Sequence, residues 1–176
     1  IKQDIFFNGN YSSENEEFDQ YLKRFGYTFK NQIRELGGYA ILKNKKIILA
    51  ADIGSSPSKI FSNDYQAGAL SFEIFSNDKK LISNAGYYSD KNNKFNKLSR
   101  STALHCALNI EDYSSCNFIE RQKNLVVDKG LKVSKKNVVF ENNYWKISGT
   151  HDGYLIKFGT NYEREVEFYP CLLYTS

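Results

Sequence analysis

Two histidines are the residues of this chain whose chemistry stands out first. His105 and His151 are its only histidines, and an imidazole can exchange a proton near neutral pH. Apolar and polar residues alternate over 103–110, which predicts a strand with His105 on the side opposite its apolar face. There, His105 is either a hydrogen-bonded structural residue or part of a cleft. His151 precedes Asp152-Gly153, which predicts a turn that enters a strand.

Three further polar residues could take part in a site. The amide of Gln66 both donates and accepts hydrogen bonds, and it either contacts a ligand or anchors a loop. Glu73 lies on the polar face of a predicted strand. We expect it to be exposed or paired with a lysine, because no partner carboxylate follows at a fixed spacing. Arg164 lies between two glutamates, and strand alternation should point it to the face opposite them, where we expect a buried ion pair or, alternatively, contact with a ligand carboxylate.

The stretch from Gln66 to Gly86 must position several of these side chains. Leu70, Phe72 and Ile74 alternate with small or polar residues, so a strand there has one apolar face. A turn at 76–78 then favours a hairpin.

The rest of the chain predicts an all-β protein, an antiparallel β-sandwich with a short N-terminal helix. Ser13 and Glu16 fit a capping box, and the apolar spacing after them predicts a helix near 14–25 that ends at Gly26. A hairpin is expected over 39–51. Further short strands at regular spacing are typical of a sandwich, and they are expected near 124–127, 137–141, 144–149, 154–158 and 162–169.

Composition limits the classes of function. The 176 residues suffice for one domain with a core, and a net charge of +4 from scattered lysines does not indicate a nucleic-acid partner. No membrane span or signal peptide is visible. The three cysteines lack metal-type spacing, and Cys106 is expected in the core. The chain starts without Met, which indicates a fragment, and 171–176 resembles a non-native adapter-derived tail.

Several ordered blocks resemble the C-terminal domain of the heparinase II/III-like family of polysaccharide lyases. They span most of residues 35 to 168 and are Gly38-Tyr39, Ala50 to Gly54, Gln66 to Glu73, Asn84 to Gly86, Arg100 to Leu108, Thr150 to Tyr154, Phe158-Gly159 and Tyr162 to Arg164. The resemblance implies that 35–170 is a β-sandwich, and that 1–34 leads in from an α/α-toroid domain upstream.

The resemblance also implies a reaction. A lyase of this kind cleaves a uronic-acid glycan by β-elimination, with the base on the upstream domain, so the fragment alone is expected to be inactive. Catalytic roles would fall to His105 and His151, and substrate binding to Gln66, Glu73, Asn84 and Arg164. The implied partners are an acidic polysaccharide and the toroid domain, in the periplasm or cell envelope. The alternative is a non-catalytic carbohydrate-binding or structural module.

Some members of the family hold zinc in this domain. They carry a His pair before the Leu-Ser-Phe-Glu strand, an Asp before the next glycine and a later His. This chain has Asp64 and Gln66 at the pair, Asn84 at the Asp position and His105 at the last. Zinc sites need three or four close donors, so we expect no metal or other cofactor here.

Overall fold

The computed structural model describes residues 15–26, 34–77, 79–122 and 124–170, and these form an all-β fold with a few short helices. The predicted N-terminal helix is confirmed as α1 (Asn15–Arg24), and its last turn closes through a hydrogen bond from the Gly26 amide to the carbonyl of Lys23. Gly26 has φ +70°, a conformation that favours glycine after a helix. The capping residue Ser13 and the tail 171–176 lie outside the described residues.

The first sheet contains five antiparallel strands in the order β1-β2-β3-β4-β5. The predicted hairpins over 39–51 and around 76–78 are both confirmed, as β2–β3 and β4–β5. The first strand of the second hairpin starts at Phe72, because Leu70 has a positive φ of 61° that interrupts extended backbone. The strands are β1 (Glu35–Leu36), β2 (Tyr39–Lys43), β3 (Ile47–Asp52), β4 (Phe72–Ser76) and β5 (Lys79–Ile82).

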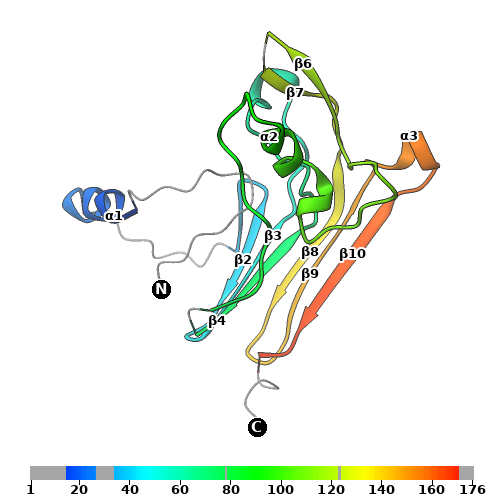
Figure 1. The fold of residues 1–176 in the computed structure, drawn as a ribbon. Helices are drawn as coiled ribbons and strands as arrows, with labels where there is room; N and C mark the ends of the chain where they lie inside the picture. The colour runs from blue at the N-terminus through cyan, green and yellow to red at the C-terminus, as the bar shows by residue number, and fades with distance from the viewer. Residues whose placement is uncertain (1–14, 27–33, 78, 123, 171–176) are drawn as a thin grey trace.

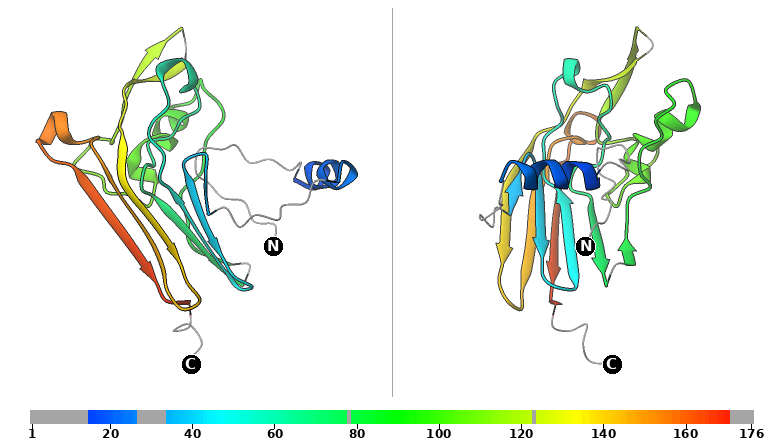
Figure 2. Two further views of the ribbon diagram at one scale, coloured as in Figure 1. Left: turned by 180° about the vertical axis from the view of Figure 1, so that it is seen from behind. Right: turned by 90° about the vertical axis from the view of Figure 1, so that its left-hand side faces the viewer.

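The second sheet has three antiparallel strands in the order β10-β9-β8, and a separate two-stranded ribbon pairs β6 with β7. The strands expected near 137–141 and 144–149 form the β8–β9 hairpin, in which the Glu141 amide donates to the carbonyl of Tyr144 at 2.9 Å across Asn142-Asn143. These strands are β6 (Asn117–Arg121), β7 (Asn124–Lys129), β8 (Val133–Phe140), β9 (Trp145–His151) and β10 (Tyr162–Phe168). Figures 1 and 2 show the five-stranded and three-stranded sheets facing each other, with β6 and β7 extending beyond one end.

The core lies between the two large sheets. Leu42, Leu49 and Ile74 from the first sheet pack in one cluster with Trp145 and Ile147 from the second. Trp145 is 1% exposed and stacks on Phe140 with ring centroids 5.1 Å apart, so the indole lies in the core. Leu70, Phe72 and Ile74 belong to the same cluster, as the strand periodicity predicted.

Two predicted strands are wrong. The segment 103–110 contains a single 3₁₀ turn, η2 (Thr102–Leu104), followed by irregular backbone. Tertiary contacts hold it, because the Thr102 hydroxyl donates to the carbonyl of Ala67 at 2.7 Å and accepts from the Ser115 amide at 2.9 Å. The segment 154–158 contains helix α3 (Leu155–Phe158), which ends at Gly159 with φ +69°. Periodicity alone does not separate short apolar strands from helices.

Two more short elements lie in the loops. They are η1 (Lys59–Phe61) and α2 (Lys94–Ser99), and α2 forms within the polar segment between β5 and β6. Figure 1 shows α2 beside β7, at the end of the sheets opposite the chain reversal between β2 and β3. Within the described part of the chain, every helix is too short or too polar to cross a membrane.

Candidate functional site

The backbone of His105 and Cys106 is the meeting point of most of the predicted site residues. Gln66 contacts the ring of His105, Asn84 accepts from the Cys106 amide, and Arg164 donates to the Cys106 carbonyl. Residues from three separated stretches of sequence therefore converge on one irregular segment. We call Gln66, Glu73, Asn84, His105 and Arg164 the polar network.

His105 is held on both sides of its ring. Nδ1 lies 2.8 Å from the carbonyl oxygen of Ser101, which can only accept, so Nδ1 carries a proton. Nε2 lies 3.2 Å from Oε1 of Gln66. The ring also packs on Gly68, where an added Cβ would lie 2.6 Å from Cδ2 of His105. The side chain is 8% exposed, which differs from the expected placement on the polar face of a strand.

The Gln66 amide can serve both protonation states of this histidine. A charged ring donates from Nε2 to the amide oxygen, whereas a neutral ring offers a lone pair to which the amide NH₂ can donate once the amide is turned. Burial lowers the pKa of His105 below its usual value, although the Ser101 carbonyl acts in the opposite direction. The neutral ring is therefore favoured at pH 7. The His105 ring can gain or lose a proton at Nε2 and keep a hydrogen bond to the Gln66 amide, once that amide is turned.

Glu73 and Asn84 are the next two members of the polar network. Glu73 is 0% exposed, so the expectation of an exposed carboxylate is wrong. Its Oε1 accepts from the backbone N–H of Asn84 at 3.0 Å. The side-chain oxygen of Asn84 in turn accepts from the backbone N–H of Cys106 at 2.7 Å. Burial is possible for a carboxylate because such hydrogen bonds compensate its lost hydration.

Arg164 joins the second sheet to this network. Its Nη1 donates to the carbonyl of Leu70 at 3.0 Å and also to the carbonyl of Cys106. The guanidinium lies 5.3 Å from the ring centroid of Phe72. On β10 the flanking Glu163 and Glu165 are exposed while Arg164 is directed inward, as strand alternation predicted, but the inward contacts shown here are to carbonyl oxygens and a ring instead of the expected ion pair.

His151 is not a member of the polar network. It ends β9 and is 1% exposed, instead of lying in a turn that precedes a strand. Its ring packs against Tyr154 and Tyr162, with centroids 5.5 and 5.1 Å away. The Gly153 amide donates to Nδ1 at 3.2 Å, so Nδ1 carries no proton. Burial lowers the pKa of His151 to about 4, and the ring is neutral at pH 7.

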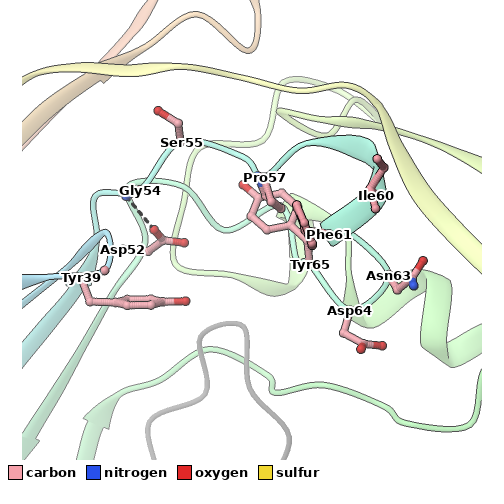
Figure 3. Close-up of a pocket in the computed structure, with 11 residues that line it drawn as sticks. Tyr39, Asp52, Gly54, Ser55, Pro57, Ile60, Phe61, Asn63, Asp64 and Tyr65 are labelled. Atoms are coloured by element: carbon pink, nitrogen blue, oxygen red, sulfur yellow. Dashed lines mark hydrogen bonds between the residues drawn. The ribbon is translucent and has the colours of Figure 1, made fainter.

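A cavity of about 530 Å³ opens beside β2, β3 and the loop that carries η1. Figure 3 shows Asp52 turned toward Gly54, whose amide donates to Oδ1 at 2.9 Å, while Asp64 lies at the other end of the cavity. The two carboxylates are therefore not arranged as an acid–base pair. Asp64 is instead engaged by Tyr87 and Lys91, at 2.9 and 3.2 Å.

The network does not fit a zinc ion. Both ring nitrogens of His105 are engaged, and the oxygen of Asn84 is a neutral amide acceptor that already holds the Cys106 amide. Among the described residues, no group of three or more His, Cys, Asp or Glu side chains is close enough to hold a metal. We therefore assign no chemistry to a metal here.

Sequence reasoning overlooked the flanks of α2. Lys94 and Lys97 line one cavity there, while Tyr88 and Phe95 line another. Arg100, at the end of the helix, is 1% exposed. The available signal is the mixture of aromatic residues and lysines over 87–100.

Comparison with known families gives one match. The family described as "Heparinase II/III-like, C-terminal" matches residues 35–171, which is well over half of the chain. No curated protein and no solved structure matches the chain.

Proposed function

The chain belongs to the heparinase II/III-like family, and from this premise we propose that it is the C-terminal domain of a polysaccharide lyase. The proposed substrate is an acidic, uronic-acid-containing glycan, and the proposed reaction is β-elimination. The observation that carries the proposal is the family match over residues 35–171. The proposed location is the periplasm or cell envelope, which fractionation of the source cells would test.

Such a reaction makes two demands on the protein. A base must reach the proton next to the uronate carboxylate, and fixed donors or cations must stabilise the negative charge that develops there. We propose that the base lies on an upstream α/α-toroid domain, and that the present domain helps to hold the glycan. Polar side chains fixed by a hydrogen-bonded framework suit this holding role, since little reorganisation is needed when the charge develops.

Catalytic roles for His105 and His151 stay predictions, and in the described domain both ring nitrogens of His105 are hydrogen-bonded within the polar network. The amide of Gln66 gives its ring a partner in either protonation state. His151 is enclosed by Tyr154 and Tyr162 and its Nδ1 is occupied. We therefore propose that His105 acts as a positioning residue, which holds the polar network in the geometry that glycan binding needs, and that His151 mainly stabilises the fold.

The test uses the full gene product on uronate polysaccharides. β-Elimination leaves a carbon–carbon double bond conjugated to the carboxylate, which is followed by ultraviolet absorbance. We expect such a product from the wild type and a fall in kcat/KM for His105→Ala, with a smaller fall for His105→Gln. Absence of any unsaturated product across uronate substrates would reject the lyase proposal.

A second candidate is a non-catalytic carbohydrate-binding module. The observation that favours it is that cavities with basic and aromatic linings flank α2, and neither histidine lines them. This alternative predicts glycan binding by the 176-residue chain together with no turnover by the full gene product.

A further inference from the structure

Helix α2 and the loop before it separate two cavities of different chemistry. On one side, a cavity of about 460 Å³ lies between α2 and the β6–β7 ribbon, and its lining includes four cationic side chains and one acidic side chain. On the other side, a groove of about 410 Å³ is lined mainly by apolar and aromatic groups. Figure 1 shows that this region lies beyond the ends of the two sheets.

The basic cavity carries a fixed positive charge. Arg100 is 1% exposed, and its guanidinium donates to the backbone carbonyls of Ser62, Tyr65 and Leu125, each at 2.7 Å. These acceptors are neutral, so they leave the charge of Arg100 in place at any accessible pH. Lys94 and Lys97 add two exposed ammonium groups, three residues apart on α2.

The apolar groove presents an aromatic platform. Tyr88 is 43% exposed and Phe95 is 49% exposed, and their ring centroids lie 5.9 Å apart. Leu98 is 47% exposed beside them. Exposed apolar groups gathered in a groove often mark a ligand site, and the C–H face of a sugar ring packs well on such rings.

The platform is held rigidly before any ligand binds. Asn96 donates from its amide to the carbonyl of Tyr88 at 2.6 Å, and the Tyr88 amide donates to the hydroxyl of Ser99 at 3.1 Å. Asn96 and Ser99 are 4% and 5% exposed, so α2 is anchored by its inner face while its lysines and Phe95 face outward. A preformed platform reduces the entropy lost on binding.

We infer that α2 and its flanking loop form a binding subsite for an acidic oligosaccharide, in which Lys94, Lys97 and Arg100 attract a carboxylate or sulfate group while Tyr88 and Phe95 hold a neighbouring sugar ring. This inference rests on the proposed function, because it names a glycan subsite of that same domain. It contains none of the five residues of the polar network but borders it, because Ala85 and Leu104, the neighbours of Asn84 and His105, line the apolar groove.

The test measures binding of the 176-residue chain to three probes by calorimetry. Alginate oligosaccharides supply carboxylates, dextran sulfate supplies sulfates, and unmodified dextran is neutral. We expect at least one acidic probe to bind, dextran to bind at least tenfold more weakly, and the acidic binding to weaken with added salt. The tighter of the two acidic probes identifies the acidic group that the subsite prefers.

The double variant Lys94→Gln/Lys97→Gln should weaken acidic binding about three- to tenfold, as expected for loss of two exposed charge contacts. The matched control is Lys43→Gln/Lys45→Gln, which removes the same net charge from exposed positions around the β2–β3 turn at the other end of the sheets. The control should change affinity less than twofold. Phe95→Ala should weaken binding of the same probe about threefold or more, with little dependence on salt.

Equal losses in the lysine variant and its control would overturn the subsite, because affinity would then follow only net charge. Binding of dextran as tight as that of the acidic probes, or of no probe at all, would overturn it too. The lyase proposal has a separate test. If the full gene product forms no unsaturated product while these variant effects persist, the subsite is supported and the lyase proposal is rejected.

Discussion

Acidification should destabilise this protein through His151. The ring is enclosed by Tyr154 and Tyr162, and its Nδ1 accepts from the Gly153 amide. Protonation would place a second N–H opposite that amide and a charge in an apolar environment. Burial therefore lowers the pKa of His151 in the fold to about 4, against an ordinary value of 6.5.

The sign of the effect follows from proton binding. Below pH 6.5 the unfolded chain takes up a proton at His151 that the fold resists until the pH nears 4, so acid favours unfolding across this window. Each pH unit inside the window costs about 1.4 kcal/mol. From pH 7 to pH 5 the contribution of His151 to the free energy of unfolding should therefore fall by about 2 kcal/mol.

Urea unfolding at pH 7 and pH 5 measures this fall, and His151→Asn is the matched variant. An asparagine oxygen can keep the hydrogen bond from the Gly153 amide but does not titrate. At pH 7 the free energy of unfolding of the variant should be lower than that of the wild type by about 1–3 kcal/mol, because packing is lost. Between pH 7 and pH 5 the variant should lose about 2 kcal/mol less of this free energy than the wild type does. Burial also lowers the pKa of His105, and because this effect is common to both proteins it cancels in the comparison.

The reasoning is refuted if wild type and His151→Asn lose the same free energy between the two pH values. The denaturant slopes should be equal for the two proteins, since a change in slope would mean that the variant altered the compactness of a state instead of the titration.

Three further predictions concern packing and thiol chemistry. Gly68→Ala should destabilise the fold by about 1–3 kcal/mol, because its Cβ would lie 2.6 Å from the ring of His105, and urea unfolding measures the loss. Trp145→Ala should cost about 3–5 kcal/mol, since the indole is 1% exposed between the sheets, and a fall in melting temperature of a few degrees or less would contradict that placement. Cys116 is buried, and burial raises the pKa of its thiol to about 12, so alkylation followed by peptide mapping should find the partly exposed Cys106 modified first in the folded protein.

The strands predicted correctly are those whose sequence contained both an alternating pattern and a turn signal. The β8–β9 hairpin illustrates this, because Asn142-Asn143 separates two β-branched and aromatic stretches. The segment 103–110 also alternates, yet it is irregular. Its conformation is set by distant groups, such as the Ala67 carbonyl that accepts from Thr102, and no local pattern reports such contacts.

The same difference between local sequence pattern and long-range contact explains which features of the candidate site could be predicted. Side-chain chemistry and the family resemblance selected Gln66, Asn84 and Arg164, and the structure joins these residues through one backbone segment. The burial of Glu73 was not predictable from its strand pattern, which indicates only that it lies on the face opposite Ile74. That second face is buried as well, because the segment around Asn84 and Cys106 covers it.

This arrangement affects how mutations in the polar network must be interpreted. Arg164 joins β10 to the carbonyls of Leu70 and Cys106, and Asn84 joins Glu73 to the Cys106 amide. Removal of either side chain leaves buried backbone groups without partners, which costs stability whether or not a glycan is bound. A loss of activity in such a variant therefore identifies a substrate contact only if the free energy of unfolding stays close to that of the wild type. The exposed lysines of α2 are free of this ambiguity, since their side chains hold no other element of the fold in place, and they provide the cleaner test of how this domain recognises an acidic glycan.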